Sequence, residues 1–541
     1  MRIDATAHFR IRAWKLVGIV VFAATGLTHI PANEPNNPAQ QCVASVYQNL
    51  QTATVRIRSG TDVASGVIVS KSGMILTVAH GLKPDSETVT VLLPGGKSCE
   101  TKCVAIDRQA DVALLAMPMD ALVDVNWSIV PVPDVVDAVI GEIVVASGFP
   151  AREPDGLTPV VRLGEVLAVE PSSVRSSCTL TSGDSGGPLV NSRGELIGLH
   201  RQIGVEADSN AHVCLQAIRS ALEKSKQWKL IRVQAGSGAL LLSKDLMPSQ
   251  HVIQTARRTC VEIYGITANE ESGIRALGTL LDARHVATKL SDILVWSDLS
   301  CRAANGTMIT ATISKSDRTR DLAILKLADA VEAGNSIAES CAAAPDSKTL
   351  IGQIVFAATG PDNVSTAGIV CRNEHTQPTQ ATRFGAALQT VGQQVQITEL
   401  SPNGSAVSAG LQIGDKLLSM DASKLSSLQD VSNLLAIRQP GDWVLIEGDR
   451  MMRPFTVQMQ LQQDPAQQFA KAEFLDGRAG QLSQRRSGFT SVLQHDIVIE
   501  PTACGGPLLD NAGHVVAINI ARRSREATFA IPIQDVIEFA R

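Results

Sequence analysis

The sequence lacks a large net charge and the short motifs of nucleotide-binding and metal enzymes. Its 48 Lys and Arg residues nearly balance 53 Asp and Glu residues, which gives a formal net charge of −5. So small a charge gives no reason to expect nucleic acid or an anionic membrane as partner. There is no phosphate-binding P-loop, GxGxxG turn, HExxH pair or basic aromatic stretch. We therefore expect neither a cofactor nor a metal.

Long hydrophobic runs are also missing, except near the N-terminus. Four basic residues precede an apolar run over residues 16–27, and polar, Pro-rich sequence follows it. This pattern predicts a secretory signal peptide within residues 1–32. An uncleaved membrane anchor is the alternative, although about 12 apolar residues are short for a full span. Either reading predicts export to the periplasm or cell envelope.

Ten cysteines are present, and their spacing does not reveal how they would pair. In an exported protein they are able to form disulfides. Buried, unpaired cysteines that act as small hydrophobic side chains are the alternative. The absence of a CxxC pair or of a nearby His pair argues against zinc.

The length of 541 residues predicts about two to four domains. Hydrophobic residues make up 44% and charged residues 19%, which argues against long disordered stretches. Forty-one glycines, 24 prolines and short apolar runs predict a β-rich fold.

Two parts of the chain resemble each other in three blocks that occur in the same order. Residues 54–82 match 260–293, residues 110–117 match 320–327, and residues 183–199 match 503–519. The repeat predicts two copies of one fold, over residues 43–230 and 250–541. The last two blocks lie about 109 residues further apart in the second copy. That difference is enough for a small inserted domain.

The insertion, residues 383–462, resembles a PDZ domain. The resemblance is carried by the segment SPNGSAVSAGLQIGDKLLSMD at residues 401–421. It implies that the loop Phe384-Gly385-Ala386 presents backbone N–H groups to the terminal carboxylate of a peptide. The following strand would pair with that peptide by β-augmentation. A groove that is closed, or used only for packing within the chain, is the alternative.

The first copy contains the three parts of a serine nucleophile system. His80 ends the strand-like run TVAH, Asp111 opens the run DVALL, and Ser185 lies in the turn GDSGGP. In this order the histidine would act as base, the aspartate would orient it, and the serine would attack. The amides of Gly183 and Ser185, with help from Asp184, would form the oxyanion hole.

These residues resemble the trypsin-like serine proteases of the HtrA (Deg) type. The segment SGVIVSKSGMILTVAH resembles the strands that lead to the histidine of that family, and Gly81 stands where most trypsin relatives have cysteine. The resemblance implies a mainly β chain with a trypsin-like double β-barrel in each copy, the first active and the second degenerate, and an α+β PDZ domain inserted in the second. It also implies an ATP-independent endopeptidase that acts on unfolded proteins, and it leaves open whether the chain forms a homo-oligomer. Asp184 departs from the Asn that many members carry.

The sequence indicates less about the substrate pocket than about His80, Asp111 and Ser185. Thr179 lies six residues before Ser185, where trypsin-like enzymes place the base of the S1 pocket. It is uncharged, so we expect small or medium aliphatic P1 residues. His200 and Arg201 are predicted to line the pocket or its rim, and exposed positions on an edge strand are the alternative.

The second copy lacks the chemistry of the first. Ser291 aligns with His80 and Cys504 aligns with Ser185, while Asp321 remains. A thiol without a base is not activated, and His285 lies six residues too early. We therefore predict a degenerate, protease-like unit rather than a cysteine protease.

Two functions follow from these observations. The leading hypothesis is an exported serine endopeptidase that cleaves unfolded or damaged envelope proteins and binds peptide C-termini at the PDZ domain. The alternative is a peptide-binding or chaperone-like protein whose proteolysis is dormant. In either case the second half, residues 250–541, is a candidate regulator of the first.

Overall fold

The structure of the protein is a computed structural model. It describes residues 37–83, 88–134, 138–151, 157–231, 235–236, 238–266, 272–331, 350–463 and 475–541. The predicted signal peptide or anchor therefore lies outside the described residues. No helix among the residues described is both long and apolar enough to span a bilayer.

The first half begins with a helix and a closed six-stranded barrel in the order β1-β2-β3-β6-β5-β4. Every strand pair in it is antiparallel. Its strands are β1 (Thr54–Ser59), β2 (Asp62–Ile68), β3 (Met74–Thr77), β4 (Thr88–Leu92), β5 (Ser98–Asp107) and β6 (Val112–Ala116). In β5, burial alternates along most of the strand, as expected for a strand with one face toward the core.

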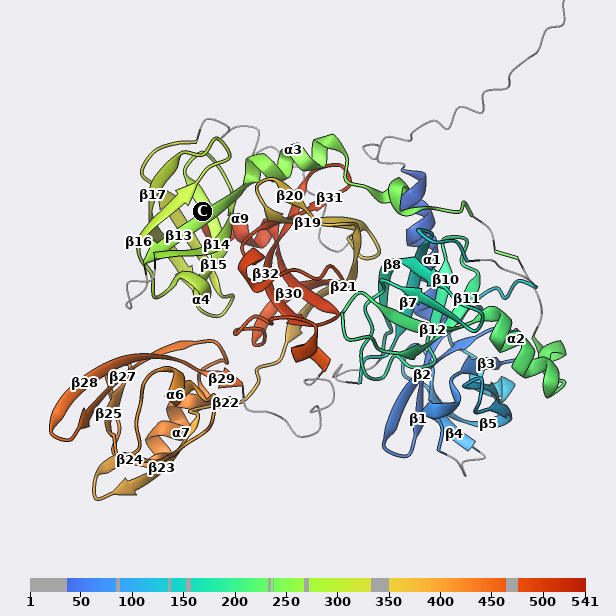
Figure 1. The fold of residues 1–541 in the computed structure, drawn as a ribbon, viewed down its shortest axis with the longest axis horizontal. Coiled ribbons are helices and arrows are strands. Elements are labelled where there is room, and N and C mark those ends of the chain that lie inside the picture. Colours follow the sequence, from blue (N-terminus) through green and yellow to red (C-terminus); the bar gives the residue numbers. More distant parts are fainter. Residues whose placement is uncertain are drawn as a thin grey trace, which may run out of the picture.

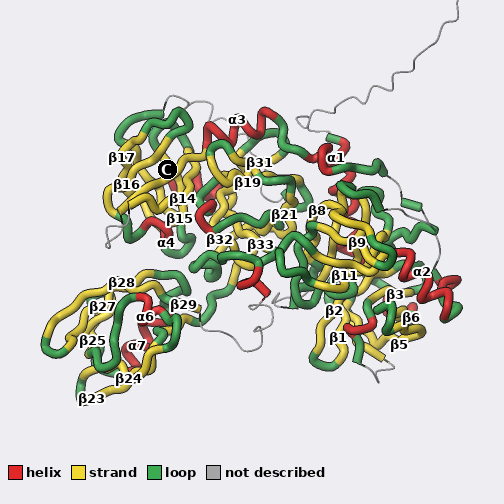
Figure 2. The backbone as a smooth tube through the Cα atoms, in the orientation of Figure 1, coloured by secondary structure: helices red, strands yellow, loops and turns green. Residues whose placement is uncertain are grey.

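A second closed barrel follows, in the order β7-β8-β9-β12-β11-β10. Its strands are β7 (Ile143–Gly148), β8 (Val160–Val169), β9 (Ser173–Ser176), β10 (Pro188–Asn191), β11 (Leu196–Gln202) and β12 (Asn210–Cys214), and helix α2 (Leu215–Lys224) ends the unit. Figures 1 and 2 show these two barrels beside each other, with α1 (Pro38–Ala53) and α2 at their margins.

The second half repeats this strand order. Helix α3 (Gln250–Thr259) leads into a closed barrel ordered β13-β14-β15-β18-β17-β16. Its elements are β13 (Cys260–Ile266), β14 (Ser272–Leu280), β15 (His285–Lys289), α4 (Leu290–Ile293), β16 (Ser297–Arg302), β17 (Met308–Asp317) and β18 (Leu322–Leu327). Asp111 and Asp321, which precede the corresponding strands β6 and β18, even share a left-handed backbone, with φ of 60° and 58°.

The last sheet has the order β20-β19-β21-β30-β33-β32-β31, and β19 also pairs with β31. Its elements are β19 (Ile354–Gly360), β20 (Asn363–Val364), β21 (Gly368–Gln377), β30 (Phe489–His495), β31 (Pro507–Asp510), β32 (Val515–Ser524), β33 (Ala527–Pro532) and the closing helix α9 (Ile533–Ala540). Apart from the short β20, this order is that of the second barrel. The predicted repeat of topology is therefore present.

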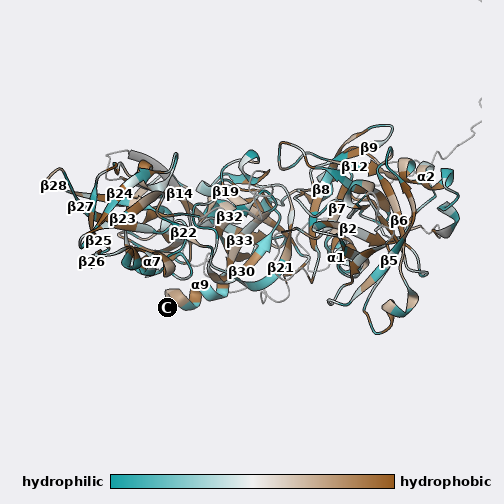
Figure 3. Ribbon diagram, turned by 90° about the horizontal axis from the view of Figure 1, so that it is seen from below, coloured by the Kyte–Doolittle hydropathy of each residue, from teal (hydrophilic) through white to brown (hydrophobic). Residues whose placement is uncertain are grey.

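A separate small unit leaves the last sheet after β21 and returns before β30. Its sheet is ordered β23-β24-β25-β27-β28, with β26 paired to β25 and a neck formed by β22 and β29. Its elements are β22 (Thr382–Arg383), β23 (Ala386–Val391), β24 (Gln394–Leu400), α6 (Ser405–Ser408), β25 (Lys416–Met420), β26 (Ser423–Lys424), α7 (Leu428–Ala436), β27 (Trp443–Arg450), β28 (Arg453–Gln460) and β29 (Gln462–Gln463). Figure 3 shows it at one end of the molecule, with the first half at the other end.

The two halves share one hydrophobic core. A single cluster of buried side chains runs from α1 (Pro38–Ala53) through the second barrel into the last sheet. Asp496 joins the halves, because its carboxylate accepts from the amide of Leu163 at 2.5 Å and from that of Ile369 at 2.7 Å. Tyr47 of α1 donates to the carbonyl of Cys371 at 3.1 Å. The two halves therefore pack against each other through a shared core, and they are not independent domains joined only by a linker.

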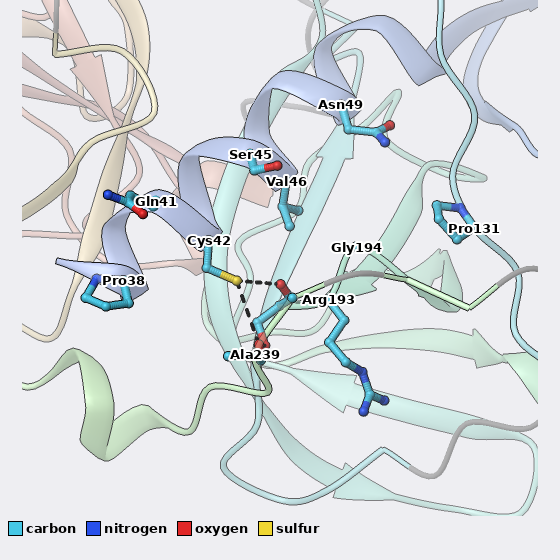
Figure 4. A pocket seen from close by; sticks show the side chains of 12 residues that line it. Pro38, Gln41, Cys42, Ser45, Val46, Asn49, Pro131, Arg193, Gly194 and Ala239 are labelled. Atoms are coloured by element: carbon cyan, nitrogen blue, oxygen red, sulfur yellow. Dashed lines mark hydrogen bonds between the residues drawn. The ribbon is translucent and has the colours of Figure 1, made fainter. Parts of the chain in front are cut away.

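Helix α1 covers the seam between the halves. Its N-cap Asn37 accepts from the amide of Ala39 at 2.9 Å, and its apolar face is buried. A hollow of about 400 Å³ lies between α1 and the turn that contains Arg193 and Gly194. Figure 4 shows Cys42 reaching from α1 across this hollow, where its thiol donates to the Ser192 carbonyl at 2.8 Å.

The described cysteines form no disulfides. Six of the nine are buried and three are partly buried, as the alternative of small hydrophobic side chains expects. Cys341 lies outside the described residues.

Candidate active site

His80 and Asp111 are brought together at one edge of the first barrel. His80 lies in a short 3₁₀ turn, Ala79–Gly81, after β3, and Asp111 immediately precedes β6, the neighbour of β3. The carboxylate of Asp111 lies 2.8 Å from His80 Nδ1 and accepts from the His80 amide at 2.9 Å. These two bonds fix both the backbone and the ring of the histidine, and among the described residues Nε2 makes no hydrogen bond.

The surroundings of Asp111 keep its carboxylate in the ionised form. Burial acts to raise the pKa of Asp111, but hydrogen bonds from the ring and amide of His80 and the charge of Arg201 hold it below its ordinary value. Arg201 Nε lies 3.6 Å from the carboxylate. An ionised Asp111 is what the orienting and stabilising role in a Ser-His-Asp system requires.

Ser185 lies in the turn that precedes β10, and this turn is tied to the first barrel. The Ser65 amide donates to the Ser185 carbonyl at 2.7 Å. Gly186 has φ of 86°, and a Cβ there would come within 2.2 Å of Thr77 Oγ1 and 2.3 Å of the Ser65 carbonyl. Only glycine fits so close to the strand that carries His80.

Two backbone N–H groups next to the nucleophile have no acceptor. Within the described part of the chain, neither the amide of Gly183 nor that of Ser185 makes a hydrogen bond. The Ser182 carbonyl accepts from the Ala151 amide at 2.7 Å, so the Gly183 N–H on the same planar peptide points the opposite way. Two unpaired donors beside a serine have the arrangement of an oxyanion hole.

Asp184 does not join this pair, although we had expected its amide to help. Its N–H donates to the Thr181 carbonyl at 3.2 Å. Its carboxylate turns inward, accepts from the Thr181 amide at 2.8 Å and lies 2.9 Å from Nη1 of Arg162. Asp184 therefore supports the turn from beneath instead of facing substrate.

The nucleophile and the base are not hydrogen-bonded to each other. No such bond joins Ser185 to His80 among the residues described. Ser185 is partly exposed, and the His80 side chain is 48% exposed. Hydrogen bonds of this kind are often loose without substrate, so the gap does not by itself argue against catalysis.

The three residues predicted for the substrate pocket lie in different surroundings. Thr179 is buried and lines a cavity of about 680 Å³ that the two halves share. Arg201 is exposed and faces Asp111. His200 is only 1% exposed, and its ring contacts the Ser147 carbonyl at 3.1 Å and His212 Nδ1 at 3.0 Å. His200 is thus a core residue beneath the turn, not a residue of an exposed rim.

The corresponding site of the second half has the same frame with different chemistry. The carboxylate of Asp321 accepts from the Ser291 amide at 2.8 Å and from its hydroxyl at 2.9 Å, just as Asp111 holds His80. Cys504 is fully buried, and burial raises the pKa of its thiol, although Lys289 opposes this. The Cys504 amide donates to the Pro501 carbonyl at 3.0 Å, so it is not available to an oxyanion.

His285 does not compensate for the missing base. Its Nδ1 lies 2.8 Å from Asp282, on the turn before β15, and it is not among the partners of Asp321. The aligned site is instead covered by the inserted unit. The Trp443 indole donates to the Ser291 carbonyl at 3.2 Å, and Arg485 reaches both Asp321 and Asp442.

Strand β23 is one of the two edge strands in the described sheet of the inserted unit. Strand β23 pairs only with β24 and lies beside α7. The loop before it contains Gly385 with φ of 79°, and in the described structure the amides of Phe384 and Gly385 have no acceptor. An open edge that begins at free amides has the features needed to hold an extended peptide by its terminal carboxylate.

No group of His, Cys, Asp and Glu side chains in the described residues is arranged to hold a metal ion. The residue that the sequence analysis missed is Arg162, the buried partner of Asp184. An arginine within the short, otherwise apolar run PVVRL at residues 159–163 was the signal that would have found it.

The first half has the two closed barrels and the site geometry of a trypsin-like peptidase, and the second half has one closed barrel and one seven-stranded sheet, with a small separate sheet inserted. The family model "Trypsin-like peptidase domain" matches residues 64–199, and the model "PDZ domain" matches residues 375–447. The chain thus contains a trypsin-like peptidase domain and a PDZ domain.

Particular relatives are serine proteases by name. "Serine endoprotease DegS" of Haemophilus influenzae is 29% identical over 216 residues, which cover 35% of this chain and 61% of DegS. "Probable periplasmic serine endoprotease DegP-like" of Halomonas elongata is 24% identical over 392 residues, which cover 69% of this chain and 73% of that protein. A crystal structure of the serine endoprotease from Yersinia pestis gives a TM-score of 0.30 at 16% identity, with 78% of this chain and 98% of that one covered.

Proposed function

We propose that this chain is an exported serine endopeptidase that works through one site, in its first half. Ser185 attacks the scissile carbonyl, His80 accepts the hydroxyl proton and later donates it to the leaving amine, and Asp111 orients the imidazole. The observation that carries this proposal is the pair of unpaired amides at Gly183 and Ser185 beside a histidine held by an aspartate. The similarity to DegS and DegP-like proteases supports the same reaction.

In this proposal the two halves of the chain have different roles. Residues 43–230 form the working protease domain, and residues 250–541 form a protease-like unit in which Ser291 stands in place of the base, Cys504 is buried, and the Cys504 amide is bonded to the Pro501 carbonyl. The PDZ domain, residues 383–462, is inserted in the second unit and captures peptide C-termini along the open edge of β23. Substrates are unfolded or damaged proteins, because these expose both extended segments and chain ends.

Export is proposed from the N-terminal sequence and from the relatives whose names describe them as periplasmic. The test is the location of the folded protein after cell fractionation. Recovery in the periplasmic fraction, with the first 32 residues removed, supports export with cleavage. Recovery in the cytoplasm would contradict the proposal.

The activity is tested by degradation of an unfolded substrate such as casein by the full chain. Ser185→Ala removes the nucleophile and should abolish casein degradation. Cys504→Ala is the matched control, because it changes the aligned residue of the second half, and it should leave degradation unchanged. Equal degradation by wild type and Ser185→Ala would refute the assignment.

The alternative, a peptide-binding protein with dormant proteolysis, has one observation in its favour. No hydrogen bond joins Ser185 to His80 in the described structure, whereas the edge of β23 is open. Reaction with a fluorophosphonate probe separates the two functions, since the probe requires an activated serine. Absence of labelling, together with measurable affinity for peptides with a free C-terminus, would favour the alternative.

A further inference from the structure

The site of the second half that corresponds to His80 and Asp111 is closed by other parts of the chain. Ser291 and Asp321 form it, and we call it the Ser291–Asp321 site. It lies where α4 follows β15, on the side of the barrel that faces the PDZ domain in Figure 1. A residual cavity of about 10 Å³ remains there, which is about the space of one water molecule. The site therefore has no room for a substrate.

The backbone of this site is held as in the first half, but a smaller side chain stands on it. Asp321 accepts from the Ser291 amide at 2.8 Å, and Asp111 accepts from the His80 amide at 2.9 Å. In the first half the imidazole extends outward from this frame, and the His80 side chain is 48% exposed. In the second half Ser291 is buried, and its hydroxyl turns back to the Asp321 carboxylate at 2.9 Å. The volume that an imidazole would fill is thus left to other residues.

A turn of the PDZ domain, residues 439–443, packs on the Ser291–Asp321 site. The Trp443 indole N–H donates to the Ser291 carbonyl at 3.2 Å, and the Asp442 and Trp443 side chains line the residual cavity. The turn is held in shape by two further bonds. The Asp442 carboxylate accepts from the Gln439 amide at 2.9 Å, and the Asp442 amide donates to the Gln439 carbonyl at 3.0 Å. The PDZ domain therefore presents a fixed surface to this site.

One buried arginine joins the PDZ domain to the Ser291–Asp321 site by charge. The side chain of Arg485 is 3% exposed and lies between two carboxylates. Its Nη1 donates to Asp442 at 2.8 Å, and its Nε lies 3.7 Å from Asp321. Removal of one partner of a buried ion pair is strongly unfavourable, so this arginine opposes separation of the two carboxylates. The backbones are also close, because a Cβ on Gly441 would lie 2.3 Å from the Arg485 nitrogen.

We propose that the Ser291–Asp321 site is a socket for the PDZ domain of the same chain. Serine at position 291, where the first half has histidine, leaves the space into which the turn of residues 439–443 docks. The socket holds the PDZ domain in one orientation on the core that the two halves share. This role needs no reaction at Ser185, so it is tested separately from the proposed protease activity.

The test restores a histidine at this position in the full chain. Ser291→His places an imidazole between Asp321 and the docked turn, and it should displace the PDZ domain. Small-angle scattering should then give a larger radius of gyration, and residues 439–443 should exchange their amide hydrogens at least about tenfold faster. Ser316→His is the matched control, because Ser316 is exposed on β17 of the same barrel, and it should match the wild type in both measurements. Wild-type values for Ser291→His in a folded chain would overturn the proposal.

A second variant covers the case in which Ser291→His unfolds the barrel, which faster exchange throughout β14 and β15 would reveal. Trp443→Phe acts from the PDZ side, because it keeps an aromatic ring and removes the N–H that the Ser291 carbonyl accepts. Loss of this hydrogen bond should raise exchange of residues 439–443 about two- to tenfold, with exchange of β24 and β25 unchanged. Trp296→Phe is the control, because Trp296 packs against the core of the barrel. Equal exchange of residues 439–443 in the wild type and Trp443→Phe would contradict the proposal.

The double variant tests whether the two side chains meet in one socket. Once Ser291→His has displaced the turn, Trp443→Phe should change exchange of residues 439–443 less than about twofold. The full effect of Trp443→Phe in that background would show that the indole acts elsewhere, and it would refute the proposed docking.

Discussion

Replacement of Gly183 by alanine should disable the site while the chain stays folded. Gly183 has φ of 101°, and a Cβ there would lie 2.4 Å from the Phe149 carbonyl oxygen and 2.6 Å from the Ala151 nitrogen. Both contacts are with backbone, so the turn itself must move. The movement takes the Gly183 N–H away from the oxyanion position, a loss worth about 2.7–4 kcal/mol, or roughly 10²–10³-fold in kcat.

Gly95→Ala separates this effect from the general cost of alanine at positive φ. Gly95 has φ of 84°, and no atom lies within 4 Å of the position of its Cβ. Gly95→Ala should therefore cost only the conformational energy of about 1–2 kcal/mol in stability and keep full activity. The assay is the phosphonylation rate of Ser185, with thermal unfolding of each variant in parallel. Wild-type reactivity in folded Gly183→Ala would refute our account of the oxyanion hole.

Three further predictions follow from the same geometry. Asp111→Asn should lower kcat on a peptide substrate by roughly 10⁴-fold, because the amide stabilises the wrong tautomer of His80; a loss below tenfold would contradict the assigned role. Burial raises the pKa of Asp184 to about 6, although the charge of Arg162 opposes this rise. Protonation of Asp184 below about pH 6 should therefore weaken its ion pair with Arg162. The phosphonylation rate of Ser185 should then fall with decreasing pH more steeply than a single protonation allows. A carboxyl whose pKa is raised on folding contributes stability in acid and loses it as pH rises through 6, so this loss of rate should precede unfolding. Gly441→Ala places a Cβ 2.3 Å from the Arg485 nitrogen and should release the PDZ domain, seen as a larger radius of gyration, whereas Gly414→Ala, with open space, should not.

The residues of the candidate site were predictable because each of them lies in a short, recognisable sequence motif. A histidine after a strand, an aspartate before one and a serine in a glycine turn are each recognisable within about ten residues. Their meeting at one edge follows from the pairing of β3 with β6 and from the bond between Ser65 and Ser185. The repeat of strand order was likewise visible as three aligned blocks.

Contacts between distant segments could not be predicted in this way. His200 looked like a rim residue, but β12 supplies His212 and makes the pair a buried one. Asp184 looked like an oxyanion donor, but its amide is held by Thr181 and its carboxylate by Arg162. The sequence pattern shows which residues are unusual, and only the packing of segments far apart in the chain shows which partners their polar groups meet.

The most direct test of the central claim is the reaction of the full chain with a fluorophosphonate, followed by mass spectrometry of its peptides. The claim is that one of two topologically repeated units performs the chemistry. We predict a single adduct, on the peptide that contains Ser185, and no modification of the peptide that contains Cys504. No adduct at Ser185 on the folded protein, or an adduct on the second half, would contradict the claim.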